Sequence, residues 1–165
     1  NGLKEIDLGA NGLMNRGGVA VAEALTLNTT LQNLGLMSNR MSDRAGLAFA
    51  SALLQNSTLT SLHMDMNDMT DFAMMGIGGS LRSNTTLKSI KLGGNPGAHE
   101  PEGMLHVACA LTQCPWHRYL EIRDVLFRLV TPMIPDIPPE CKDWSNERFL
   151  DYCFLSFYDK MLAMA

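Results

Sequence analysis

The feature that most constrains the fold of this 165-residue chain is an internal repeat with a period of 28 residues. Four segments follow the frame L-x-x-L-x-L-x-x-N-x-L, allowing for other apolar residues and a glycine at the last position of the fourth. They begin at Leu3, Leu31, Leu59 and Leu87, and their asparagines are Asn11, Asn39, Asn67 and Asn95. A second block closes the units as ALTLNTT, ALLQNST, SLRSNTT and ALTQCPW. A fixed period of this length indicates stacked supersecondary units that bury a shared core.

Each unit predicts a short strand followed by a helix. Leu34 and Leu36 show the two-residue spacing of a strand, and the Asn follows where the chain must turn. A side-chain amide at a turn can bond backbone groups that lack a strand partner, so stacked asparagines would form a ladder. In the later half of the second unit, Leu47, Ala50 and Leu54 recur at helical spacing among small residues, which predicts a helix packed closely on the strands.

This pattern resembles the leucine-rich repeat proteins of the long, ribonuclease-inhibitor-like subclass. The closing block A-L-x-x-N-x-T-L is similar to repeats of NOD-like receptors, Ran GTPase-activating protein, tropomodulin and the CARMIL actin regulators. The resemblance implies an α/β fold, a right-handed leucine-rich repeat solenoid. It would form a segment of a horseshoe with parallel strands on the concave face and helices on the convex face. It implies no single function, because the repeated positions form the scaffold.

The repeat divides the chain into two parts. Residues 1–116 contain the four repeats, the fourth lengthened by two residues within GNPGAHEPEG. Residues 117–165 are predicted to hold a degenerate fifth strand at 118–122, a Pro-rich connector and a C-terminal capping helix that begins near Ser145. A solenoid needs both ends covered, so at the uncapped N-terminal end we expect further repeats of a longer chain or contact with another chain.

Composition excludes several classes of protein. The net charge of −4 argues against nucleic acid or anionic membranes as partners, since both need clustered Lys and Arg. No apolar run is long enough to span a bilayer. Four cysteines, all at or after residue 109 in a chain with ample apolar residues, are expected to be reduced thiols, which favours a cytoplasmic location.

The residues between the strand leucines are predicted to line the concave face in columns. Three columns follow from the repeat, and their glycines favour a weak contact. Nine members are the candidate partner-binding residues: Glu5, Asp7, Asn33, Met37, Ser61, His63, Asp65, Ser89 and Lys91. The alternative is that these are solvated strand residues in a fragment that extends a larger scaffold. No cofactor is expected.

Two other motifs have a structural explanation in the repeat. One motif consists of residue types that bind zinc: His106, Cys109, Cys114 and His117. In the repeat, however, Cys114 takes the place of the closing Asn, and His106 and Cys109 fall on a helix surface. Three N-x-[ST] tripeptides, which begin at Asn28, Asn56 and Asn84, match the glycosylation signal but recur with the repeat. We therefore expect neither a metal site nor glycosylation.

The function predicted from these features is that of a non-enzymatic protein–protein interaction module or scaffold subunit. No phosphate-binding loop or nucleophile motif is present. Two alternatives come from the resemblance: a Ran-type GTPase-activating module, and an actin-regulating domain similar to tropomodulin. No residue can be carried over from the GTPase activators, and Arg40 is expected to be a solvated turn residue.

Overall fold

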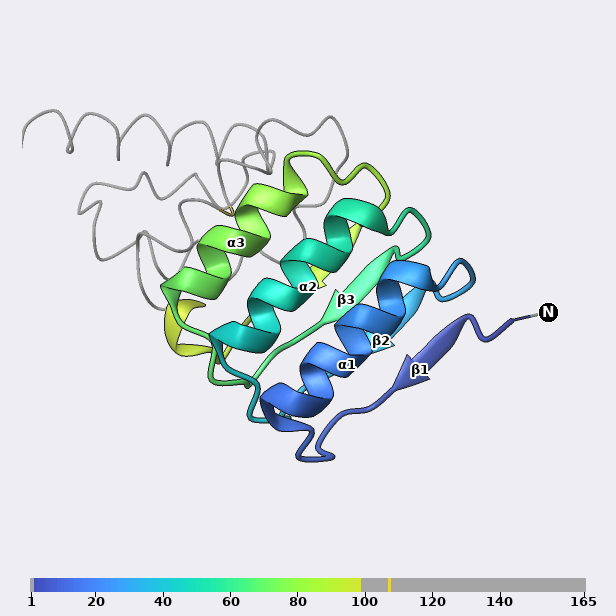
Figure 1. Ribbon diagram of the computed structural model, residues 1–165. Coiled ribbons are helices and arrows are strands. Elements are labelled where there is room, and N and C mark those ends of the chain that lie inside the picture. The colour runs from blue at the N-terminus through green and yellow to red at the C-terminus, as the bar shows by residue number, and fades with distance from the viewer. Residues whose placement is uncertain (1, 99–106, 108–165) are drawn as a thin grey trace, which may run out of the picture.

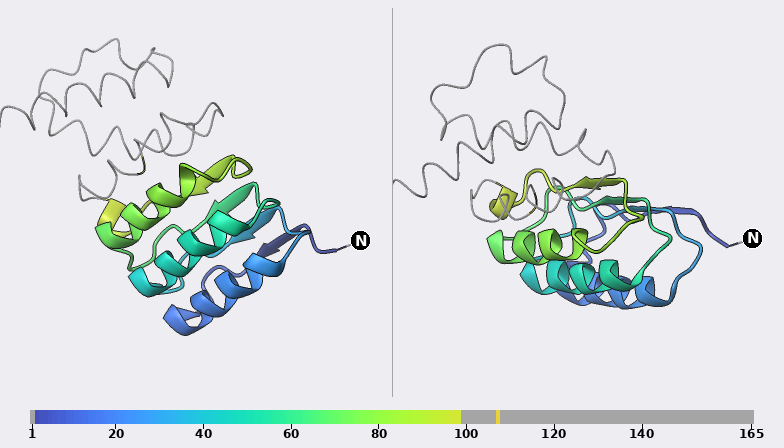
Figure 2. Two further views of the ribbon diagram at one scale, coloured as in Figure 1. Left: turned by 45° about the horizontal axis from the view of Figure 1, so that its top comes forward. Right: turned by 90° about the horizontal axis from the view of Figure 1, so that it is seen from above.

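Strands and helices alternate along the chain. The computed structural model describes residues 2–98 and residue 107. The described elements are β1 (Glu5–Asp7), α1 (Met14–Leu27), β2 (Asn33–Gly35), α2 (Asp43–Gln55), β3 (Ser61–His63), α3 (Asp71–Leu81), β4 (Ser89–Lys91) and the 3-10 helix η1 (Pro96–Ala98). The strands form one parallel sheet in chain order. Helices α1 to α3 lie side by side in a second layer against one face of that sheet (Figures 1 and 2). This is the α/β solenoid that the repeat predicts.

The strands pair without any slip of register. Ile6 lies opposite Leu34, Leu34 opposite Leu62, and Leu62 opposite Ile90, so each partner is 28 residues further along the chain. Residues on either side of these positions point to the opposite face, because side chains alternate along a strand. The repeat period therefore sets which side chains stand next to one another on each face of the sheet.

The turn asparagines form the predicted ladder. Asn67 is almost fully buried, and its Oδ1 accepts hydrogen bonds from the backbone N–H groups of Asn39 (2.9 Å) and Met41 (3.1 Å) in the preceding repeat. Its Nδ2 donates to the carbonyl oxygens of Leu36 and Met64, both at 3.0 Å. Asn39 and Asn95 make equivalent bonds. Each turn is thus held both to itself and to the turn before it.

A second column of asparagines stands at the other end of the repeat, where the helices end. Nδ2 of Asn56 donates to the carbonyl oxygens of Leu25 (2.8 Å) and Asn28 (2.9 Å). Its Oδ1 accepts hydrogen bonds from two backbone N–H groups of the segment that leads into β3. Asn84 repeats this arrangement. Both side chains are buried. A glycan attaches at Nδ2, so the buried, bonded amides support the structural explanation of the N-x-[ST] pattern at Asn56 and Asn84.

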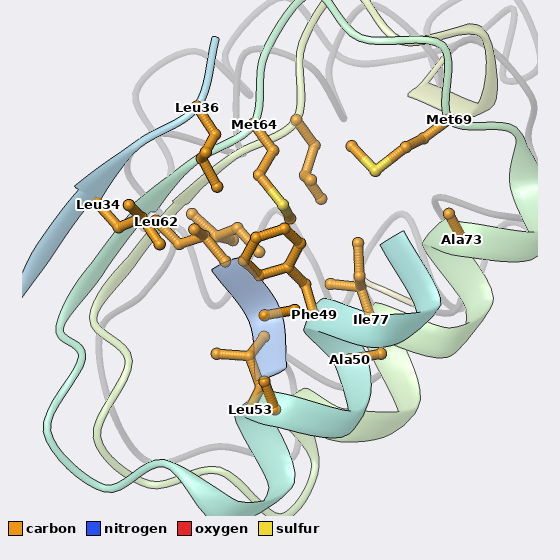
Figure 3. Close-up of a cluster of buried hydrophobic side chains, with 14 of the residues drawn as sticks. Leu34, Leu36, Phe49, Ala50, Leu53, Leu62, Met64, Met69, Ala73 and Ile77 are labelled. Atoms are coloured by element: carbon orange, nitrogen blue, oxygen red, sulfur yellow. The ribbon is translucent and has the colours of Figure 1, made fainter. Parts of the chain in front are cut away.

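The core lies between the sheet and the helices. Leu34 and Leu62 point from the strands towards Phe49 of α2, with Ile77 of α3 beside it (Figure 3). Met64 fills a leucine position of the frame and is fully buried, as are Met41 and Met69. An unbranched, polarisable side chain fits such positions with little loss of packing. The methionines at leucine positions are therefore core residues.

The helical spacing predicted α2 but not its buried face. Of the three residues that indicated the helix, only Ala50 is buried; Leu47 is 47% and Leu54 is 58% exposed. The buried face is formed by Ala45, Phe49, Ala52 and Leu53 together with Ala50. The apolar pattern of α2 is compatible with two different buried faces, because leucine and alanine occur all around the helix. The structure buries the face with Phe49, since so bulky a side chain fits only in the space between the helix and the sheet.

The fourth repeat begins as predicted. Its longer loop contains η1, and an ideal Cβ at Gly97 would lie 2.2 Å from the carbonyl carbon of Thr70, so only glycine fits there. Val107 is buried at the position equivalent to Ile77, which agrees with a two-residue insertion. The degenerate fifth strand, the Pro-rich connector and the C-terminal capping helix lie outside the described residues. Within 2–98 and 107, no helix combines the length and apolar character needed to cross a membrane.

Candidate protein-interaction surface

The face of the sheet that the helices leave open is lined by the three predicted columns. The first column pairs Glu5, Asn33, Ser61 and Ser89 in direct register, and the second pairs Asp7, Gly35, His63 and Lys91. The third, two residues further on, contains Met37 and Asp65 between glycines. All nine candidate residues line a single open hollow over the sheet, which we call the strand-side groove.

The two ends of the strand-side groove differ in charge. Glu5 and Asp7 stand exposed on β1, whereas β3 and β4 contribute His63, Asp65 and Lys91. Between them β2 presents no ionisable group. The groove therefore runs from an acidic edge, across a neutral strip, to a mixed edge that carries the only lysine among its lining residues.

A glycine in the neutral strip sets how the acidic edge is shaped. An ideal Cβ at Gly35 would lie 2.6 Å from Oδ1 of Asp7, closer than real side chains approach. The same Oδ1 accepts a hydrogen bond from the backbone N–H of Gly9 at 2.9 Å. Gly35 thus leaves space for the Asp7 carboxylate to lie over β2, where the backbone of its own turn holds it.

The mixed edge is organised around Asp65. Burial raises the pKa of the Asp65 carboxyl, and the backbone N–H groups of Asp65 and Gly93 together with the charges of His63 and Lys91 partly offset that rise. Nε2 of His63 lies 3.1 Å from Oγ of Ser61 in a hydrogen bond. This edge therefore presents a partly desolvated carboxylate beside a histidine and a lysine, a combination suited to polar recognition of a partner.

Met66 is an exposed lining residue that was not among the nine candidates. Met66 also lines the strand-side groove, is 62% exposed and has a left-handed backbone with φ of 52°. The equivalent residues Ala10, Ser38 and Gly94 all have positive φ as well. In the sequence Met66 directly follows Asp65 of the third column, in the turn rather than in a strand. An exposed methionine is an adaptable apolar contact for a partner.

Metal binding finds no support in the part of the chain that the structure describes. No group of three or more His, Cys, Asp or Glu side chains is placed there to hold an ion. His106, Cys109, Cys114 and His117 lie outside the described residues.

Comparison with known proteins agrees with this architecture. The family model described as Leucine Rich repeat matches residues 55–78, which run from the end of α2 into α3. Among solved structures, the chain is similar to leiomodin-1 actin-binding site 2, with 22% sequence identity, a TM-score of 0.61, and coverage of 80% of this chain and 83% of that chain. None of the curated proteins matches the sequence significantly. At this identity the likeness is one of fold.

Proposed function

Because the chain is a leucine-rich repeat protein, we propose that it is a non-catalytic protein–protein interaction module or scaffold subunit of the cytoplasm, which binds its partner through the strand-side groove. One observation carries the proposal: nine polar or exposed side chains, seven from the four strands and two from the turns after β2 and β3, line one open groove, and those of the strands stand in register. The Asn ladders hold the backbone beneath them, so these side chains are arranged before the partner arrives. Such preorganisation lowers the entropic cost of binding.

The charges of the groove define the partner's contact surface. A basic group would face Glu5 and Asp7, and an acidic group would face Lys91 and His63, because complementary charges guide association and set orientation. Small side chains and Gly35 in the strip between them leave space for the partner's backbone or a bulky side chain. Met37 and Met66 supply the apolar contacts.

Affinity capture tests this proposal. The tagged chain is used to capture proteins from a lysate of its source, in parallel with a variant that carries His63→Ala, Asp65→Ala and Lys91→Ala. The matched control carries Asp68→Ala and Arg82→Ala, which remove one charge of each sign from exposed positions that do not line the groove. A partner that the wild type and the control retain and the triple variant loses supports the proposal. A partner that all three retain would place the contact elsewhere.

Actin regulation is a second candidate, favoured by the similarity to leiomodin-1 actin-binding site 2 over most of both chains. Co-sedimentation of the chain with actin filaments, together with the rates of filament growth at the two ends, tests it. If the chain neither pellets with filaments nor changes those rates, the actin candidate is wrong and the broader proposal of a protein-binding groove still stands.

We propose a separate contact at the first repeat of the solenoid, where a further repeat or another chain packs. Oδ1 of Asn11 and Nδ2 of Asn28 have no hydrogen-bond partner among residues 2–98 and 107, whereas the equivalent atoms of Asn39 and Asn56 bond the preceding repeat. Leu3 is 60% exposed. Replacing residues 1–2 by a copy of residues 31–58 should raise the thermal unfolding temperature; an unchanged temperature would contradict this packing.

A further inference from the structure

A second hollow lies on the helix side of the molecule, away from the strand-side groove. Its lining comes from the start and middle of α1, from the turn before α2 and from the first turn of α2. Three arginines line it: Arg16, Arg40 and Arg44. We call this hollow the arginine groove.

The repeat itself brings these arginines together. Arg16 and Arg44 are 28 residues apart, so they occupy equivalent positions on the neighbouring helices α1 and α2. Arg40 joins them from the turn that follows β2. The third repeat has Phe72 and Asp68 at the equivalent positions, which confines the basic cluster to the first two repeats.

The arginine groove concentrates positive charge in a chain whose net charge is −4. Residues 2–98 contain seven Lys and Arg, of which three line this groove. All three arginines are exposed, and none forms an ion pair within the described part of the chain. Glu23 is the one carboxylate among the lining residues. The excess of guanidinium groups is thus available to an external acid.

The backbone around the arginine groove is fixed by a reciprocal pair of hydrogen bonds. Nδ2 of Asn15 donates to Oγ of Ser42 at 2.6 Å, and the N–H of Ser42 donates to Oδ1 of Asn15 at 2.9 Å. This pair ties the beginning of α1 to the turn that carries Arg40. The backbone of Arg40 is left-handed, with φ of 54°, where the first repeat has Gly12 with φ of 61°.

The apolar part of the lining gives the groove a second recognition element. Met14 is 54% exposed and lines the groove with the half-buried Val19. An occupant therefore meets guanidinium groups and an apolar surface together. Arginine forms paired hydrogen bonds with carboxylates and phosphates alike. Three guanidinium groups that come from two helices and a turn, beside an apolar surface, favour an extended acidic segment over a single small anion.

We propose that the arginine groove binds an acidic segment of a partner protein, with Arg16, Arg40 and Arg44 pairing its Asp or Glu side chains and Met14 and Val19 contacting one apolar side chain between them. This contact is independent of the strand-side groove, so the chain carries two protein-binding surfaces on opposite layers. Such an arrangement suits a scaffold that holds two partners at once.

Selection from a display library of random 12-residue peptides tests the proposal, with the full chain as the target. The selected peptides are synthesised, and their affinities are measured by fluorescence anisotropy against the wild type and against Arg16→Gln, Arg40→Gln, Arg44→Gln combined. Arg82→Gln, an exposed arginine at the end of α3, is the matched control. Unfolding by urea checks that all variants fold, which their exposed positions lead us to expect.

The expected result is enrichment of peptides with several Asp or Glu and one large apolar residue. Their affinity should fall at least about tenfold in the triple variant, stay unchanged in the control, and decrease with added salt. Peptides without acidic enrichment, or with equal affinity for the triple variant, would overturn the proposal. Binding to phosphatidylserine vesicles but to no peptide would also overturn it, because it would assign the groove to a membrane surface.

Discussion

The buried side chain of Asn67 should contribute more to stability than any single polar group on the surface. In Asn67→Ala the backbone N–H groups of Asn39 and Met41 lose their acceptor, and the carbonyl oxygens of Leu36 and Met64 lose a donor. A buried donor left without a partner costs about 1–3 kcal/mol. The two N–H groups together therefore predict a loss of about 2–6 kcal/mol, a large fraction of the roughly 5–15 kcal/mol that stabilises a typical domain.

Asn11→Ala is the matched control, because it removes the same side chain from the first turn of the ladder. Asn11 is exposed, and its side chain makes one hydrogen bond, from Nδ2 to the carbonyl oxygen of Gly9 at 3.1 Å. Its loss should cost within about 0.5 kcal/mol, as is usual for surface positions. Asn67→Asp keeps one acceptor oxygen but turns a second oxygen towards the carbonyls of Leu36 and Met64, so it should also destabilise the fold strongly.

Urea unfolding followed by circular dichroism gives the free energy of unfolding for each variant. The order expected is wild type close to Asn11→Ala, with both far above Asn67→Ala. Equal losses of unfolding free energy in the two alanine variants would refute the reasoning. They would show that the hydrogen bonds between repeats contribute nothing to stability beyond the bonds within one turn.

Three further predictions follow from the helices and from the strand-side groove. Gly79→Ala should stabilise the fold by about 0.5–1 kcal/mol, because an added Cβ meets open space on α3; Gly46→Ala should destabilise it, because that Cβ would lie 2.6 Å from Cβ of Ala73. Thermal unfolding distinguishes the two. Phe49→Ala should cost about 3–5 kcal/mol in urea unfolding, whereas Leu54→Ala, at a largely exposed position, should cost less than about 1 kcal/mol. Burial raises the pKa of Asp65, so the folded chain holds this proton more tightly than the unfolded chain, and stability falls as pH rises above the unfolded pKa. Asp65→Asn should therefore increase the free energy of unfolding at pH 7, and this gain should vanish as the pH approaches 3; a gain of the same size at both pH values would show that the carboxylate is not its source.

The sequence predicted the strand face well because two periods coincide there. The 28-residue repeat decides which positions are equivalent, and the two-residue alternation decides which of them face outward, so these two periods alone place His63 and Lys91 side by side. The buried face of α2 was less predictable, since leucine and alanine surround that helix and Leu47 fits the same spacing as Phe49.

The arginine groove could not be predicted from the repeat frame alone. Arg40 does lie in an exposed turn, as its place after Asn39 indicated. Its contribution to a shared hollow with Arg16 and Arg44 depends on the path of that turn towards the start of α1, which the hydrogen bonds between Asn15 and Ser42 fix. Side-chain bonds between residues 27 apart leave no mark in the local sequence pattern.

The absence of any slip in register between neighbouring strands makes the repeat a unit that can be exchanged whole. Excision of residues 31–58 would join Thr30 to Leu59, restore the same frame, and bring Asn67 to the place that Asn39 holds against the first turn. The strand-side groove would then lose Asn33, Gly35 and Met37 and keep both of its charged edges. The distance between the acidic and the mixed edge can therefore change in steps of one strand spacing, roughly 4.8 Å, while the charged residues of both edges are kept. Evolution or design can adjust the length of such a surface separately from the charges at its two edges.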